Sequence, residues 1–210
     1  MLNNFLDILE DIFLIRKENS KYIELYLDKT KYYQKEINSF SLDKVFVCLL
    51  YEENLQKDLK NFKYRYNKTS NIDFINYFIR LFQENLSDLN KENTIIIGIP
   101  MYFINRFLRW YNQTYILWKW LSKKIWIPFL EIIKKTKYTT NQAWLSKEKR
   151  LNNLKNCFKI NSKYNNTLKG KNIIIIDDII STGTTANEVA KVLKSAWAKQ
   201  IVGLFLATWN

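Results

Sequence analysis

Hydrophobic and polar positions divide the 210-residue chain into short apolar runs and helically spaced segments. An uninterrupted apolar run predicts a strand that is buried on both faces, as in a parallel sheet. Such runs occupy residues 44–51, 94–99, 173–176 and 200–207. Apolar residues three and four positions apart predict amphipathic helices. These helices are expected at residues 72–86, 106–124 and 186–196. Strands alternating with helices from residue 94 onward predict an α/β fold with a mostly parallel central sheet.

Other parts of the chain carry weaker patterns. Residues 1–40 mix polar and apolar positions and are expected to be helical. Residues 59–66 alternate enough to predict a second strand beside residues 44–51, and residues 127–133 also predict a strand. Residues 135–165 are basic and poorly periodic, which indicates a loop with one helix.

The residue types exclude several kinds of site. The chain has no histidine, and Cys48 and Cys157 form no CxxC pair, which excludes a zinc finger and a histidine-based triad or metal site. Both cysteines lie in apolar patterns and are expected to be small core residues in a reduced, cytoplasmic setting. The acidic N-terminus predicts a packed amphipathic helix, with no secretory signal and no membrane insertion; membrane attachment is the less favoured alternative.

The net charge of +13 is concentrated in one stretch. Residues 101–171 carry 16 lysines and arginines against Glu131 and Glu148, whereas the rest of the chain has 17 basic and 18 acidic residues. A field of this kind favours phosphate-rich ligands, including nucleotides and nucleic acid. The alternative is a lysine-rich coding bias, but a bias would spread lysine evenly along the chain.

The segment 173–185 joins a buried strand to a helix and carries the most specific chemistry. Two carboxylates can accept hydrogen bonds from sugar hydroxyls or hold a hydrated Mg²⁺. A hydroxyl-rich turn that includes a glycine brings backbone amides to the start of a helix, where a phosphate group binds. The segment therefore predicts a site for a sugar phosphate. Its ligand-binding residues are expected to be Asp177, Asp178, Ser181, Thr182, Gly183, Thr184 and Thr185.

This segment has two alternative interpretations. The first is a capped turn without a ligand, since Asp, Ser, Thr and Gly are common in such turns. The second is the magnesium site of an ATPase, because an apolar strand that ends in two acids also resembles a Walker B motif. That site requires G-x-x-x-x-G-K-[ST] upstream, and none of the four glycines begins this pattern.

The segment closely resembles the 5-phosphoribosyl pyrophosphate motif of type I phosphoribosyltransferases, and further motifs resemble the ComF (competence protein F, or GntX-like) branch of that family. Arg109-Trp-Tyr-Asn-Gln113 is similar to the branch's Arg-Gly-Phe-Asn-Gln. Tyr51 and Phe62-Lys-Tyr64 are similar to its early elements. Its middle motif is matched by the spacing of Thr139, Gln142, Leu145, Arg150, Asn153 and Phe158. The resemblance covers roughly residues 44–208.

The resemblance implies a type I phosphoribosyltransferase fold in residues 44–210, preceded by a small helical or hood-like extension in residues 1–43. It implies a Mg²⁺-dependent enzyme that transfers phosphoribosyl from phosphoribosyl pyrophosphate to an unknown nitrogen acceptor. The alternative is a non-catalytic protein of DNA uptake, with single-stranded DNA or competence proteins as partners. A nucleotide-sensing regulator is weaker, since no helix-turn-helix is apparent.

The resemblance also assigns roles to individual residues. Asp177 and Asp178 are implied to contact the ribose hydroxyls, to act in catalysis and to hold the metal. Residues 181–185 are implied to wrap the 5-phosphate. Arg109 is a further catalytic candidate, and Arg106 and Arg150 are candidate cations for the leaving group. The pyrophosphate loop is expected to include Pro100, Met101, Tyr102 and Arg106.

The sequence departs from the family pattern in three ways. Residues 1–43 lack the cysteines of the family's zinc ribbon, and Tyr102 stands where histidine is frequent. All seven tryptophans lie between residues 110 and 209, several at positions that favour glycine. We hypothesise that Trp110, Trp126, Trp144 and Trp197 arise from UGA codons that the organism reads as glycine. The alternative is genuine aromatic positions in a core or a base-stacking surface.

Overall fold

A computed structural model describes residues 21–64, 68–100, 113–137, 154, 156–164 and 166–209. Its strands are β1 (Glu24–Asp28), β2 (Lys44–Leu50), β3 (Thr94–Gly98), β4 (Ile133–Lys135), β5 (Phe158–Ile160), β6 (Asn172–Ile180) and β7 (Gln200–Thr208). Its α-helices are α2 (Thr30–Glu36), α3 (Glu53–Tyr64), α4 (Lys68–Leu86), α6 (Gln113–Ile125) and α8 (Thr184–Ser195). Two short 3₁₀ helices are η1 (Lys91–Asn93) and η3 (Ser162–Tyr164).

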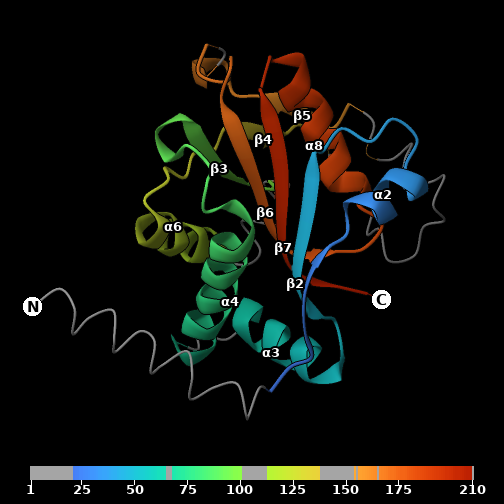
Figure 1. Cartoon of the computed structure of the whole chain (residues 1–210), viewed down its shortest axis with the longest axis vertical. Coiled ribbons are helices and arrows are strands. Elements are labelled where there is room, and N and C mark those ends of the chain that lie inside the picture. Colours follow the sequence, from blue (N-terminus) through green and yellow to red (C-terminus); the bar gives the residue numbers. More distant parts are fainter. Residues whose placement is uncertain are drawn as a thin grey trace, which may run out of the picture.

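The central sheet has five strands in the order β1-β2-β7-β6-β3 (Figure 1). β2, β7, β6 and β3 are parallel to one another, and β1 joins the edge in the antiparallel direction. A separate antiparallel pair is formed by β4 and β5. This arrangement confirms the predicted α/β fold with a mostly parallel sheet flanked by helices.

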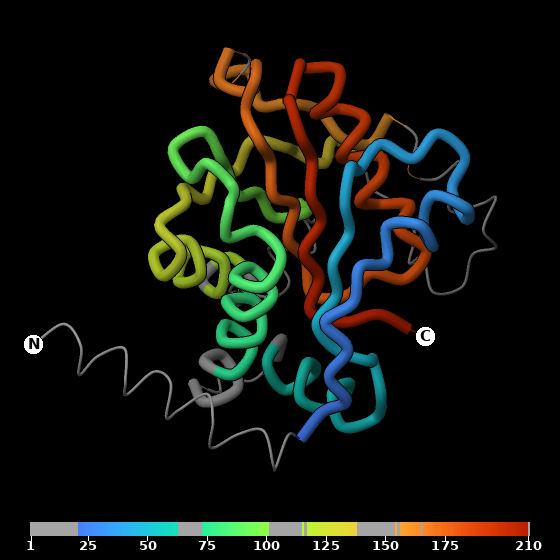
Figure 2. Tube along the Cα trace, viewed as in Figure 1, coloured from blue at the N-terminus to red at the C-terminus, as the bar shows by residue number. Residues whose placement is uncertain are grey.

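Helices cover both faces of the sheet, as the chain trace also shows (Figure 2). One apolar cluster lies under α3, α4 and α6 and includes Phe74, Phe78 and Trp118. The other lies under α2 and α8 and includes Tyr33 and Val189. The isoleucines of β6 alternate between the two clusters, so a strand with apolar residues at every position is buried on both sides.

The elements with the clearest patterns are confirmed. The apolar runs form β2, β3, β6 and β7, and the helical spacing of residues 72–86 and 186–196 corresponds to α4 and α8. The helix expected at residues 106–124 appears as α6 over its described part. Cys48 and Cys157 are both buried, as their apolar surroundings predict.

Four expectations about secondary structure are wrong. Residues 158–160, which are expected to lie in a loop with one helix, form β5 and pair with β4. Residues 59–64 belong to α3, because Leu55, Leu59 and Phe62 follow a helical spacing and all three are buried. Residues 24–28 form the edge strand β1 where a helix was expected, since they pair with β2. Residues 127–132 make only a single bridge, between Phe129 and Ile96, before β4 begins at Ile133. Pro128 lies in that segment and lacks the N–H that a continuous ladder requires.

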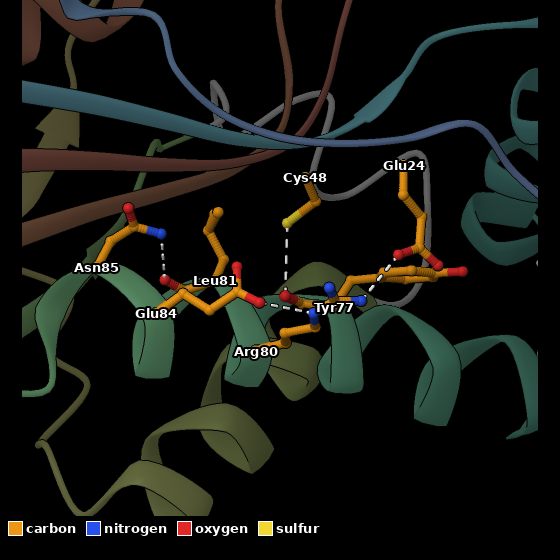
Figure 3. Close-up of polar contacts among 7 residues, drawn as sticks. All are labelled: Glu24, Cys48, Tyr77, Arg80, Leu81, Glu84 and Asn85. Atoms are coloured by element: carbon orange, nitrogen blue, oxygen red, sulfur yellow. Dashed lines mark hydrogen bonds and ion pairs between the residues drawn. The ribbon is translucent and has the colours of Figure 1, made fainter. Parts of the chain in front are cut away.

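Ion pairs attach β1 to the helical layer (Figure 3). Arg80 of α4 donates to Glu24 of β1 at 2.9 Å and to Glu84, one turn along its own helix, at 2.8 Å. The guanidinium also lies 4.1 Å from the centre of the Tyr26 ring. Nearby, the Cys48 thiol donates to the carbonyl of Tyr77 at 3.5 Å. These contacts hold the edge strand β1, which lies before residue 43, against α4, which lies after it.

Two helices end in left-handed turns that tryptophan occupies. After α6, Trp126 has φ of +60°, and after α8, Trp197 has φ of +64°. In both turns the next amide reaches back five residues, from Ile127 to the Ser122 carbonyl and from Ala198 to the Leu193 carbonyl, each at 3.2 Å. This bond defines the Schellman motif, whose left-handed position is usually glycine. Both positions therefore have the left-handed conformation that favours glycine. Trp110 and Trp144 lie outside the described residues.

Candidate functional site

The two candidate acids lie on the central strand β6 near its carboxyl end. Asp177 and Asp178 are part of the strand, which continues to Ile180, so the expectation that they follow the strand end is wrong. Both are partly exposed. The Oδ1 atom of Asp177 accepts from the Asp178 amide, and that of Asp178 accepts from the Ile179 amide, each at 2.9 Å. These local bonds orient both carboxylates relative to the backbone.

The sheet is irregular at the level of these acids. In the β6–β7 ladder, the residues before and after Asp178 and Leu206 are paired, but these two residues are not paired with each other. In the β2–β7 ladder, the same is true of Cys48 and Leu206. Ile176 and Ile179 contact the same apolar cluster, although strict alternation would place residues three apart on opposite faces. A local irregularity of this kind re-aims side chains in the way that a β-bulge does. The acids therefore lie where the regular alternation of the strand is broken.

The phosphate loop, defined as residues 181–185, connects β6 to α8. Gly183 has φ of +71° and is the N-cap of α8, and Thr184 and Thr185 form the first positions of the helix. The hydroxyls of Thr182 and Thr184 lie 3.0 Å apart. Because the N-cap is a glycine, no side chain caps the helix there, which argues against a simple capped turn. The first N–H groups of a helix lack intrahelical partners and suit a phosphate group.

The pyrophosphate loop is only partly described. Pro100 follows β3, and the preceding Ile99 amide donates to the Ile176 carbonyl of β6 at 3.2 Å. Pro100 therefore lies at the same edge of the sheet as Asp177. The remaining candidates of this loop and the candidate cations lie outside the described residues. They are Met101, Tyr102, Arg106, Arg109 and Arg150.

The donor chemistry of the site suits a Mg²⁺ ion that arrives with its ligand. Within the described ranges, no group of three or more Asp, Glu, Cys or His side chains is assembled for a metal. Mg²⁺ in phosphate sites is commonly held by one or two carboxylates, substrate phosphates and waters. Asp177 and Asp178 would supply carboxylates for such an ion next to the loop that suits a phosphate. They fit substrate-carried Mg²⁺ better than a metal cage formed by the protein alone.

Sequence reasoning missed the residues that support the phosphate loop. Tyr33 of α2 is only 1% exposed, and its hydroxyl donates to the Ser181 carbonyl at 3.2 Å. Burial raises the pKa of Tyr33 to about 12. Asn187 of α8 is also 1% exposed. The only sequence signal at Tyr33 is its helical spacing with Ile37. This spacing predicts that Tyr33 lies on a buried helix face, but it does not predict the hydrogen bond to Ser181.

The region that contains this loop is similar to known proteins. The family model described as the phosphoribosyl transferase domain matches residues 112–206. The resemblance is thereby confirmed. Competence protein F of Haemophilus influenzae is 36% identical to the chain over 107 residues, which are 50% of this chain and 46% of that protein. The DNA utilization protein YhgH of Escherichia coli K12 is 30% identical over 99 residues, which are 47% of this chain and 42% of that protein.

A third relative matches a longer part of the chain. Competence protein ComFC of Bacillus subtilis is 26% identical over 144 residues, which are 68% of this chain and 55% of that protein. These relatives are consistent with the ComF branch of the phosphoribosyltransferase superfamily. The chain spans about half the length of the curated relatives it matches.

Among solved structures, adenine phosphoribosyltransferase from Saccharomyces cerevisiae is similar, with a TM-score of 0.45 and 18% identity. The match covers 68% of this chain and 70% of that chain. Among the helices in the described part of the chain, none combines the length and the apolar character that a membrane span requires.

Proposed function

We propose that this chain binds 5-phosphoribosyl pyrophosphate together with Mg²⁺ and transfers the phosphoribosyl group to a nitrogen acceptor. The proposal rests on one observation: β6, the phosphate loop and α8 follow one another directly along the chain. Two carboxylates are followed within eight residues by a left-handed glycine and a helix start. The carboxylates suit a sugar diol or its Mg²⁺, and the helix start suits the 5-phosphate.

The proposed reaction is a substitution at C1 of the ribose. The nitrogen lone pair of the acceptor forms the new C1–N bond while the C1–O bond to pyrophosphate breaks. Pyrophosphate leaves with the electron pair of that bond, and the acceptor nitrogen loses a proton. The transition state has oxocarbenium character, so stabilising the leaving group matters more than a strong base. Mg²⁺ supplies part of this charge stabilisation when bound, and Arg106, Arg109 and Arg150 are the candidate cations.

The test is release of pyrophosphate from Mg²⁺–phosphoribosyl pyrophosphate in the presence of candidate nitrogen bases. We expect turnover in the unmodified protein and a loss of at least about 100-fold in Asp177→Asn/Asp178→Asn, because the ligand loses both carboxylates. Glu188→Gln is a matched control, since Glu188 pairs with Lys191 on the same helix at 2.6 Å. Equal turnover in the double variant and the control would contradict the roles given to the two acids.

A second candidate function is DNA uptake through a basic face without turnover. It is favoured by the names of the relatives, which refer to competence and DNA utilization, and by the basic stretch at residues 101–171. In the β4–β5 pair, Lys134 lies directly opposite Lys159, and both are exposed. Like charges in this position destabilise a strand pair unless a ligand neutralises them.

Single-stranded DNA binding at several salt concentrations tests this alternative. If both lysines contact phosphates, Lys134→Ala/Lys159→Ala lowers the slope of log affinity against log salt by about 1.4, because each neutralised phosphate of a single strand contributes about 0.7. The matched control is Lys191→Ala, since Lys191 is already paired with Glu188. An unchanged slope in the double variant would exclude these two lysines from the DNA-binding face.

A further inference from the structure

The segment at residues 29–41, which precedes the region matched by the family model, packs against the phosphate loop. Tyr33 connects the two through its hydroxyl group. This group donates to the Ser181 carbonyl at 3.2 Å and lies 3.2 Å from the hydroxyl of Thr208 at the end of β7. One buried side chain thus contacts both the beginning of the phosphate loop and the neighbouring strand.

The ring of Tyr33 also limits the space around the tightest point of the loop. A Cβ atom built on Gly183 would lie 2.9 Å from Cδ1 of Tyr33 and 3.1 Å from Cδ1 of Ile37. Distances this short leave no room for a side chain at Gly183. The α2 helix is therefore in direct contact with the backbone of the loop, and the left-handed turn at Gly183 is held against a rigid aromatic surface.

A second link joins the same segment to α8. The Oδ1 atom of Asn187 accepts from the Ser41 amide at 2.7 Å, and its Nδ2 atom donates to the Ser39 carbonyl at 3.4 Å. The Asn187 amide in turn donates to the Gly183 carbonyl at 2.9 Å. Residues 29–41 consequently support the loop from the strand side through Tyr33 and from the helix side through Asn187.

We infer that Tyr33 is a positioning residue that holds the phosphate loop in the conformation that receives the 5-phosphate of a phosphoribosyl ligand. The inference rests on the proposed function for its ligand. A loop that binds phosphate through backbone amides depends on their being aimed before the ligand arrives. The Tyr33 hydroxyl fixes the carbonyl at the start of the loop, and the ring supports the glycine at its centre. Neither contact requires Tyr33 to touch the ligand.

Tyr33→Phe separates the hydroxyl from the ring, and Tyr32→Phe is the matched control because Tyr32 is the adjacent residue and is 46% exposed. Calorimetry measures the affinities for ribose 5-phosphate, Mg²⁺–phosphoribosyl pyrophosphate and Mg²⁺–pyrophosphate. We expect Tyr33→Phe to bind the first two about 5-fold more weakly, as loss of one hydrogen bond implies. Pyrophosphate affinity stays unchanged, since it does not use residues 181–185. Tyr32→Phe matches the unmodified protein with all three ligands.

Amide hydrogen exchange of residues 181–185 in the ligand-free protein gives a readout that does not depend on any ligand. Exchange should accelerate in Tyr33→Phe and not in Tyr32→Phe. Unchanged exchange together with unchanged ribose 5-phosphate affinity would overturn the inference and leave the proposed function intact. An equal loss of affinity in both variants, or an equal loss for pyrophosphate, would also overturn it.

If the unmodified protein binds none of the three ligands, the proposed function fails. Faster exchange confined to Tyr33→Phe would in that case still support the control of the loop by Tyr33. Tyr33→Ala removes the ring as well as the hydroxyl. If the ring supports Gly183, this variant should show faster exchange than Tyr33→Phe, and equal rates would contradict the support assigned to the ring.

Discussion

The left-handed turn at Gly183 and those at Trp126 and Trp197 have the same sign of φ but opposite surroundings. Gly183 is buried, with Tyr33 and Ile37 in the space that a side chain would need. Trp126 and Trp197 are 82% and 76% exposed, so their side chains have room. Glycine at residue 183 is thus required for both conformation and space. Tryptophan at the two helix ends is strained by conformation alone, with little burial to offset the strain.

This difference bears on the tryptophans as a group. Trp118 is 3% exposed, and its ring packs edge-on against Phe78 with the ring centres 5.0 Å apart. It is an ordinary core residue within a helix. Trp126 and Trp197 lie in Schellman turns where glycine is favoured. The hypothesis that UGA encodes glycine therefore applies to positions such as these and not to Trp118. UGG codons at residues 110, 126, 144 and 197 of the gene would contradict it.

The largest expected effect is at Trp118. Trp118→Ala should lower the free energy of unfolding by about 3–5 kcal/mol, because it leaves a cavity beneath α4 and α6. Denaturant unfolding measures this change. The matched control is Trp120→Ala on the same helix, where the side chain is 57% exposed and the cost should stay within about 0.5 kcal/mol. Equal costs at the two positions would contradict the distinction between core and exposed tryptophans.

Gly183→Ala should cost about 2–4 kcal/mol of unfolding free energy, since a Cβ is unfavourable at positive φ and collides with Tyr33. Gly170→Ala is the control for conformation alone, because Gly170 has φ of +72° and no atom lies within 4 Å of its Cβ position. The difference between the two variants, measured by denaturant unfolding, isolates the contact with Tyr33. Equal losses would show that this contact adds nothing.

The burial of Tyr33 predicts a pH dependence. Its pKa rises to about 12 in the folded protein, compared with about 10 in the unfolded chain. The folded state therefore retains a proton that the unfolded state loses, and stability falls between pH 10 and pH 12. The unmodified protein should lose about 2 kcal/mol more than Tyr33→Phe over this range. Parallel stability curves for the two proteins would contradict the burial of the hydroxyl.

The smallest effect has the opposite sign. Trp126→Gly and Trp197→Gly should each raise the free energy of unfolding by about 1 kcal/mol, because glycine relieves the left-handed strain. Thermal or denaturant unfolding of each variant measures the gain. Trp197→Ala keeps the Cβ and should show no such gain. A loss of stability in Trp197→Gly would mean that the exposed indole makes a stabilising contact.

Local patterns predicted the parts of the fold that local sequence determines. The isoleucine run of β6 and the helical spacing in α4 and α8 are properties of the segments themselves, and so is the acid–hydroxyl–glycine order around Gly183. β1 depends on pairing with β2, so its five residues carried no strand signal of their own. Residues 59–64 alternated enough to suggest a strand, although Leu59 and Phe62 belong to a helical face.

The support of the phosphate loop was beyond local prediction for the same reason. Tyr33 and Ser181 are 148 positions apart, and neither residue type indicates the other. The irregularity at Asp178 spans three neighbouring strands and depends on their register. Contacts of this kind arise only when distant segments assemble, so the sequence indicated the chemistry of the site but not what holds it in place.

Calorimetry with Mg²⁺–phosphoribosyl pyrophosphate, compared with Mg²⁺–ATP, tests the central claim most directly. A site formed by Asp177, Asp178 and the phosphate loop should bind phosphoribosyl pyrophosphate at least about 10-fold more tightly than ATP, and Asp177→Asn/Asp178→Asn should remove this preference. Equal affinities for the two ligands, or a preference that survives in the double variant, would contradict the assignment of this site to a phosphoribosyl group.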